Sequence, residues 1–282
     1  MAEQVYFDYV SADLLEEIIE GMASDPADVT MWTEHIDSFF EDFGLTDVIL
    51  FQKAHKSAPA QSSQYAQPSQ SISPSPSLTC SIYQHLFENT GHRVRYYKGI
   101  EIEADNENEL NALIRKERPK ADFLIVRSDD EKIIRAAADT ADVNAVLPIS
   151  NRAQKPAAGR INHIVAKIAA DKKTAFAFDI APFLFVKGYR KSKLFSDIME
   201  MIPILRKYHV PVLLFSGACS IFEMRGPYEL EAFGRLFGMT QEETVLAVSG
   251  APDQILSKHQ KKKAGELISP GFEIYFKDET EV

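Results

Sequence analysis

Two kinds of apolar pattern alternate along the chain: short continuous runs, and longer segments in which apolar residues recur every three or four positions. The first kind is typical of buried strands and the second of amphipathic helices. The runs predict strands at residues 5–9, 47–51, 94–103, 123–126, 145–147, 175–178 and 210–215. The periodic segments predict helices between them, among these 82–89, 133–141, 161–170 and 194–208.

Start and stop signals support the helices near the N-terminus. Asp13 and Glu16 have the spacing of a capping box. They precede one apolar helical face, formed by Leu14, Leu15, Ile18, Ile19 and Met22. A second helix ends at Gly44 and carries Trp32, Ile36, Phe39, Phe40 and Phe43 at helical spacing. A later helix, marked by Leu110, Leu113 and Ile114, ends at Pro119.

The order strand then helix recurs seven times in one direction. Such a chain forms a parallel sheet, and seven units favour a barrel over an open sheet. The eighth unit is irregular, because Thr240 and Glu243 repeat the capping-box spacing and Gly250 stands where a glycine would end a helix. Residues 244–248 are therefore predicted to be helical, and 272–276 to form a late edge strand. The predicted fold is α/β, a TIM-barrel-like (β/α) barrel with about seven regular strands.

The segment 57–77 interrupts this alternation. Sixteen of its 21 residues are Ser, Pro or Gln, and none is charged. Such a segment buries too little apolar area to offset the entropy of ordering it. A length of 282 residues permits one barrel or two smaller domains. We expect a single barrel domain over 1–282, with a disordered surface insertion at 57–77.

The composition is that of a soluble globular chain, with 45% hydrophobic and 26% charged residues. The apolar stretch 175–186 is interrupted by Asp179 and Pro182, so it is too short for the roughly 20 residues of a bilayer span. The first twenty residues include neither Lys nor Arg, which is the wrong charge for a leader peptide. We expect a cytoplasmic protein without a membrane segment. Cys80 and Cys219 are too sparse for a disulfide framework or a cysteine-rich zinc site.

The net charge of −10 is concentrated near the N-terminus. Residues 1–56 hold 13 acidic and 2 basic side chains, whereas residues 57–282 hold 28 acidic and 29 basic ones. Because charges act mainly within a Debye length of about 8 Å, a polyanion-binding face elsewhere on the molecule is permitted. The acidic helices near the N-terminus are either solvated or a docking surface for a basic protein.

Polar residues stand at the predicted carboxyl ends of several strands, where barrels of this type place their working residues. They are Asp8, Glu101, Glu103, Arg127, Asp179 and the pair Ser216-Gly217. Carboxylates gathered there could bind a metal, act as an acid/base pair, or form ion pairs, for instance Arg127 with Asp8 or Glu101. Ser216-Gly217 also occupies a position at which loop amides can bind phosphate. None of the seven histidines forms an HxH or HExxH pair, so no zinc centre is predicted.

A cationic segment follows the sixth predicted strand. Between 182 and 196 there is no acidic residue, while Lys187, Arg190, Lys191 and Lys193 alternate with aromatic side chains that include Tyr189. A flexible loop of this composition suits contact with an RNA backbone, and Tyr189 suits stacking on an unpaired base. A merely solvated loop has the same composition. Lys258 and 261–263 form a second, weaker basic patch.

Three segments resemble one family: KADFLIV at 120–126 with Arg127, NHIVAKIAA at 162–170, and FSGACSIFEMRGPYELEAFGRLFGM at 215–239. They are similar to component 3 of archaeal ribonuclease P, whose eukaryotic counterpart is the thirty-kilodalton subunit of ribonuclease P and ribonuclease MRP. The resemblance covers about 4–51 and 82–274. The segment 215–239 is its most specific part.

The resemblance implies a barrel related to the polymerase and histidinol phosphatase hydrolases. Metal-dependent relatives carry an HxH pair near strand one, where this chain has Phe7-Asp8-Tyr9-Val10-Ser11. They often carry Ser-Asp-Ala-His after strand seven, where this chain has Ser216-Gly217-Ala218-Cys219. Only Glu101 matches a metal-ligand pattern, and one carboxylate does not hold a metal cluster.

The resemblance therefore implies a noncatalytic protein subunit of the ribonucleoprotein that removes 5′ leaders from precursor tRNA. It implies no metal or cofactor in this chain, the divalent metal lying with the catalytic RNA. The expected partners are ribonuclease P RNA, component 2, with two copies of each protein, the other ribonuclease P proteins and precursor tRNA. The expected RNA contacts are Lys187, Tyr189, Arg190, Lys191, Lys193 and Arg127.

Two other functions remain open from the residues alone. A stand-alone metal-dependent phosphohydrolase would use Glu101, Asp179 and Ser216-Gly217. An enzyme-derived barrel used only for protein interaction would need no RNA.

Overall fold

Seven parallel strands form the centre of the structure, a computed structural model that describes residues 5–20, 29–54, 82, 84–87, 92–150, 157–158, 160–263, 267–269 and 272–273. The strands, in their order around the sheet, are β1 (Phe7–Ser11), β2 (Asp47–Ala54), β3 (Arg95–Ile102), β4 (Phe123–Arg127), β5 (Ala145–Leu147), β8 (Ala175–Asp179) and β9 (Val212–Phe215). Each neighbouring pair is parallel. All seven predicted strands are present, and the predicted α/β barrel is confirmed.

The barrel closes through the segment that follows β9. The Gly217 N–H donates to the Tyr9 carbonyl at 3.1 Å, and the Ser11 N–H donates to the Ala218 carbonyl at 2.7 Å. The first strand of the barrel is therefore joined to its last by a short seam of backbone hydrogen bonds rather than by a strand ladder.

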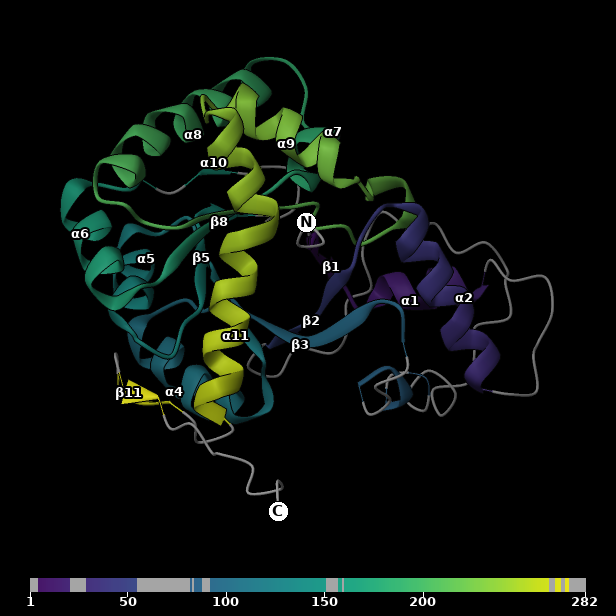
Figure 1. Cartoon of the computed structure of the whole chain (residues 1–282). Coiled ribbons are helices and arrows are strands. Elements are labelled where there is room, and N and C mark those ends of the chain that lie inside the picture. Colours follow the sequence, from purple (N-terminus) through teal and green to yellow (C-terminus); the bar gives the residue numbers. More distant parts are fainter. Residues whose placement is uncertain are drawn as a thin grey trace.

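Helices cover the outside of the barrel (Figure 1). They are α1 (Asp13–Glu20), α2 (Val29–Asp42), α4 (Glu107–Glu117), α5 (Glu131–Asp139), α6 (His163–Lys172), α7 (Ala181–Phe185), α8 (Tyr189–Lys207), α9 (Pro227–Leu236), α10 (Gln241–Val245) and α11 (Ala251–Lys263). In Figure 1, α4, α5, α6 and α8 lie along one side of the barrel, and α1 and α2 lie on the other. The described part of the chain has no helix that combines the length and apolar character needed to cross a bilayer.

Side-chain caps explain where several of these helices begin. The side chains of Asn106, Asp130 and Asn162 accept hydrogen bonds from backbone amides in the first turns of α4, α5 and α6. Thr240 and Glu243 form the predicted capping box at the start of α10. Gly44 ends the α2 segment with φ of 76°, a conformation that glycine adopts without strain.

The interior of the barrel is packed with aromatic rings. Tyr9 stacks on Phe51 with ring centroids 4.2 Å apart, and Phe123 and Phe215 complete the cluster. Gly99 lies in β3 beside this cluster, where a Cβ would come within 2.8 Å of Ile49 Cγ2 and 3.1 Å of Phe51 Cβ. A glycine at this position lets β2 and its large side chains approach β3 closely.

The eighth unit is helical over 244–248, as predicted, but its helix continues past the expected end. Gly250 does not end a helix, because α10 continues through a π-helix (Leu246–Gly250) directly into α11. Residues 241–263, all of them described, contribute no strand to the barrel. The late strand β11 (Phe272–Glu273) pairs antiparallel with β10 (Leu267–Ser269) in a separate small sheet, so it is not an edge of the barrel. A second small hairpin, β6 (Ile149–Ser150) with β7 (Ala157–Ala158), was not predicted.

Two predictions concern segments that the structure describes only in part or not at all. The insertion at 57–77 lies outside the described residues. The predicted helix at 82–89 is represented by residues 82 and 84–87, which are helical.

Candidate functional site

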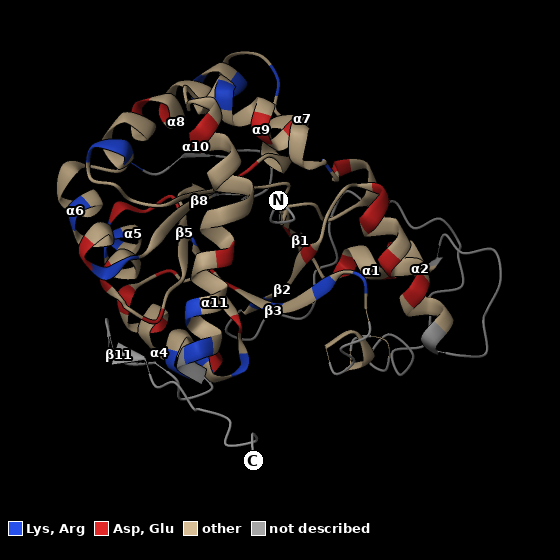
Figure 2. Cartoon of the chain, in the orientation of Figure 1, with Lys and Arg blue, Asp and Glu red and all other residues tan. Residues whose placement is uncertain are grey.

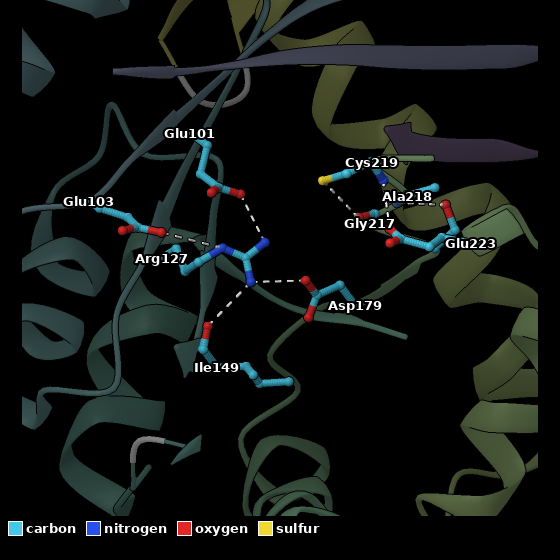
Figure 3. Close-up of polar contacts among 10 residues, drawn as sticks. Glu101, Glu103, Arg127, Ile149, Asp179, Gly217, Ala218, Cys219 and Glu223 are labelled. Carbon is cyan, nitrogen blue, oxygen red and sulfur yellow. Dashed lines mark hydrogen bonds and ion pairs between the residues drawn. The ribbon is translucent and has the colours of Figure 1, made fainter. Parts of the chain in front are cut away.

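Arg127 lies at the centre of the barrel mouth, between two carboxylates (Figure 3). Its Nη2 is 2.9 Å from Glu101 Oε2, and its Nη1 is 2.9 Å from Asp179 Oδ2. All three side chains are buried. The predicted ion pair of Arg127 with Glu101 is confirmed, whereas the alternative partner Asp8 is engaged elsewhere.

Two further contacts hold the same guanidinium. Nη1 donates to the Ile149 carbonyl at 3.3 Å, and Nε lies 4.0 Å from Glu103 Oε1. Burial opposes the charged form of Arg127, but attraction to Asp179 and Glu101 outweighs it and raises the pKa of Arg127 well above its usual value. Arg127 is therefore a permanent internal cation.

Among the described residues, the mouth also contains buried polar atoms without a hydrogen-bond partner. The Tyr9 hydroxyl and Asp179 Oδ1 are examples. Burial raises the pKa of the Asp179 carboxyl, and the Arg127 charge acts in the opposite direction. In the same part of the chain, no group of three or more His, Cys, Asp and Glu side chains has an arrangement that could hold a metal ion. Arg127 occupies the space between the two carboxylates that a hydrolytic metal site would require.

Ser216 and Gly217 belong to the barrel seam. The Ser216 amide and hydroxyl donate to Asp8 at 2.6 and 2.5 Å, and the Ala218 amide donates to Ser216 Oγ. The Gly217 amide is bonded to Tyr9. These amides are therefore occupied, and the suggested phosphate-binding role of Ser216-Gly217 is wrong. Burial raises the pKa of Asp8 to about 7, although its hydrogen bonds to Ser216 and Tyr9 lower it.

The cationic segment is not the flexible loop that was predicted. Helix α8 begins at Tyr189, five residues before the predicted start, so Arg190, Lys191 and Lys193 lie in its first turns. The start is hidden in the sequence for two physical reasons. Gly188, at the N-cap, has no side chain to form a cap, and cations in a first turn oppose the helix dipole.

These side chains nevertheless form one largely exposed basic surface, visible as blue segments where the chain enters α8 (Figure 2). Tyr189 is 80% exposed. Lys193 Nζ lies 2.9 Å from Asp197 Oδ1, so its charge is partly compensated. Hydrogen bonding to Asp197 is the main reason that the pKa of Lys193 is raised, while the charge of Arg160 acts against it.

Arg160 is the cation that sequence reasoning missed. It is exposed and follows β7, which lies beside α8, so that its charge is close enough to act on Lys193. The signal was hidden because Arg160 stands alone in the sequence, about thirty positions before the cluster that it joins. Lys187, Tyr189, Arg190, Lys191, Lys193 and Arg160 are called the α8 basic surface below.

Arg127 does not belong to this surface. It is only 4% exposed, and its guanidinium faces the carboxylates of the mouth. The structure therefore places the sixth predicted RNA contact inside the barrel, away from the other five. The second basic patch lies on α11, where Lys258 and Lys261 are exposed.

Comparison with known proteins identifies the family of this barrel. The sequence model described as RNase P subunit p30 matches residues 25–264. The chain belongs to this family.

Relatives of this p30-family chain carry the corresponding name. It is 35% identical to ribonuclease P protein component 3 of Methanococcoides burtonii over 180 residues. The aligned region covers 64% of this chain and 72% of that relative. It is 33% identical over 164 residues to ribonuclease P protein component 3 of Methanosarcina barkeri, with 58% and 67% covered. The resemblance predicted from sequence is confirmed, and the chain is a ribonuclease P protein subunit.

The fold of the p30-family chain also has a solved counterpart. A chain in the cryo-EM structure of archaeal ribonuclease P with mature tRNA superposes with a TM-score of 0.66 over 97% of this chain and 99% of that one. The sequence identity is 15%, so this comparison supports the barrel fold.

Proposed function

We propose that this subunit supports the RNA of ribonuclease P and performs no chemistry itself. The observation that carries the proposal is the position of Arg127 between Glu101 and Asp179. The carboxylates at the barrel mouth neutralise an internal cation, so they are not available as a pair for a metal or for acid/base work. The proposed role in removing 5′ leaders from precursor tRNA is therefore that of a scaffold.

The α8 basic surface is the proposed RNA contact. Its cations suit phosphate groups, whose neutralisation dominates protein affinity for nucleic acids. The exposed Tyr189 ring suits stacking on an unpaired base. The helical setting strengthens the argument, because side chains on a regular element are held in fixed positions relative to one another.

The remaining partners follow from membership of the family. We infer assembly with ribonuclease P RNA, with component 2 in two copies of each protein, with other ribonuclease P proteins, and with precursor tRNA. The divalent metal of the holoenzyme would lie with the RNA subunit, and the chain itself would need no cofactor. We infer a cytoplasmic location.

The test is precursor-tRNA cleavage by a reconstituted holoenzyme across a salt series. Lys187, Arg190, Lys191 and Lys193 are replaced together by Gln. Activity is expected to fall and to depend less steeply on salt than that of the wild type, since each lost phosphate contact lowers the log–log salt slope by about 0.7 to 0.9.

The matched control replaces four exposed cations on α4 and α5, namely Arg115, Lys116, Lys132 and Arg135. It removes the same number of charges from two other helices and is expected to retain activity at every salt concentration. Equal loss in both variants would show a general charge effect. Full activity of the α8 variant would refute the proposed contact.

A further inference from the structure

Phe222 projects into solvent from a short 3₁₀ turn (Ile221–Glu223) that follows β9. Its side chain is 84% exposed, although the neighbouring Glu223 and Met224 are only 8% and 2% exposed. A single exposed apolar side chain is common on protein surfaces, so the setting of Phe222 decides whether it marks an interaction site.

The backbone around Phe222 is held from both sides. The Ile221 amide donates to Glu17 Oε2 of α1 at 2.8 Å, and the Cys219 amide donates to Glu223 Oε2 at 2.8 Å. Arg225 Nη1 donates to the carbonyls of Phe222 and Met224 at 3.0 and 2.5 Å. The turn is therefore fixed before any partner arrives, which lowers the entropy cost of binding.

The surroundings of this turn are acidic. Through Glu17 the turn contacts α1, which has no cation and also carries the exposed Asp13 and Glu16. A Cβ on Gly226 would lie 3.0 Å from the Phe43 carbonyl, just beyond the end of α2 at Asp42. The charge of Glu41, one residue earlier, is compensated by Arg93 at 2.7 Å. There is no Lys or Arg among residues 1–52. Figure 2 shows red but no blue segments on α1 and α2.

This charge decides between two kinds of partner. An RNA would bring phosphates toward carboxylates, which costs energy, whereas a basic protein surface is complementary. Two cations lie near the turn. Arg225 donates to two backbone carbonyls, so it is engaged within the turn itself. Lys53, at the end of β2, lies on the Cys219 side, where burial raises the pKa of that thiol and the charge of Lys53 lowers it.

We propose that Phe222, held next to the acidic residues of α1, anchors a protein partner that presents an apolar pocket surrounded by Lys and Arg. This surface, called the Phe222 surface, is distinct from the α8 basic surface. The inference rests on the proposed function only in naming the other ribonuclease P proteins as the partners to test.

The experiment measures the affinity of the full chain for each of the other ribonuclease P proteins of the same organism, purified singly. Phe222→Ala is expected to weaken one of these complexes at least tenfold, since a central aromatic anchor carries much of the binding energy. Its melting temperature should match wild type, because an 84% exposed ring contributes little to the core.

Charge reversal provides a second variant. Asp13→Lys combined with Glu16→Lys should slow association with the same partner and flatten its salt dependence. Met199→Ala is the control for Phe222→Ala, because Met199 is an apolar side chain on α8 that is 49% exposed. It should bind like wild type.

Several outcomes would overturn the inference. One is that Phe222→Ala binds every partner of the unaltered chain with wild-type affinity. The Phe222 surface would then not be a docking site, while the proposed function would stand. Another is that Phe222→Ala loses affinity only for ribonuclease P RNA, which would make nucleic acid the occupant. A third is self-association of the wild type that Phe222→Ala abolishes, which would make a second copy the occupant. If the wild-type chain binds neither the proteins nor the RNA, the proposed function itself fails.

Discussion

Arg127 and Glu101 form a buried ion pair, Nη2 to Oε2 at 2.9 Å, inside the mouth of a barrel whose other carboxylate at this point, Asp179, faces the same guanidinium. The pair limits the chemistry that is possible at the barrel mouth. A cation supplied by the chain itself occupies the central position, and its removal would leave two buried carboxylates facing each other.

The first prediction concerns this cation. Arg127→Ala should lower the free energy of unfolding by about 3 to 5 kcal/mol, because breaking a buried pair leaves uncompensated charge. Arg127→Lys should lose less, since an ammonium keeps the charge but lacks the fork that spans both carboxylates. Urea unfolding measures both variants. A loss below about 1 kcal/mol for Arg127→Ala would contradict the role of Arg127 as the partner of two buried carboxylates.

The second prediction concerns the pH dependence of stability. The pKa of Asp8 is raised to about 7 in the folded state, so the folded chain binds a proton that the unfolded chain does not. Its contribution to stability is lost as the pH rises through 7. Between pH 8 and pH 6 the free energy of unfolding should therefore rise by about 1.4 kcal/mol from this group.

Asp8→Asn isolates the effect. Its amide oxygen can accept from the Ser216 and Tyr9 amides as Asp8 does, but it does not titrate. The difference in stability between wild type and Asp8→Asn should change by about 1.4 kcal/mol across this window. A constant difference would show that Asp8 is ionised throughout.

The third prediction concerns the close approach at the seam. Gly217 has φ of 63°, and a Cβ there would lie 2.6 Å from Asp179 Cβ. Gly217→Ala should cost about 2 kcal/mol or more, combining backbone strain with a clash inside the barrel. Gly238 has φ of 86°, and a Cβ there would meet no atom within 4 Å, so Gly238→Ala measures the strain alone. Equal melting temperatures for the two variants would argue against the clash.

The fourth prediction is that the purified chain binds no stoichiometric metal. Arg127 engages the two carboxylates, and burial raises the pKa of the nearby Cys219 to about 12, so the thiol is protonated. Elemental analysis after dialysis is the measurement. One tightly bound zinc or manganese ion per chain would contradict this prediction and favour the hydrolase function.

The fifth prediction separates stacking from charge on the α8 basic surface. Tyr189→Ala should weaken binding to single-stranded RNA about tenfold, within the range of one base–aromatic stack. Because the lost ring carries no charge, the slope of affinity against salt should stay unchanged. Tyr189→Phe keeps the ring and should bind normally. A changed slope, or weak binding by Tyr189→Phe, would point to a polar contact instead.

The sequence predicted the strands well, because each is a short apolar run buried on both faces of a parallel sheet. It failed at the start of α8, where Gly188 provides no cap and the first turn carries the wrong charge for a helix dipole. It failed at Gly250, because a π-helix continues where a glycine stop was expected. Capping rules consider only neighbouring residues, so they did not predict a helix that continues past a glycine.

The candidate site was predicted in part. Arg127, Glu101 and Asp179 stand at strand ends, so their proximity followed from parallel topology alone. The hydrogen bond of Asp8 with Ser216 was not predicted, although both residues were candidates, because nothing in the sequence marks the backbone seam that joins β1 to the segment after β9. Arg160 was missed because it stands alone in the sequence and only the fold brings it to α8.

The seam between β1 and the segment after β9 also sets an order for folding during synthesis. Asp8 leaves the ribosome 208 residues before Ser216, an interval of about 10 to 40 s at roughly 5 to 20 residues per second. For that time β1 can pair with β2 on one side only. The barrel thus carries an open edge through most of translation, and closure awaits a segment from the last quarter of the chain.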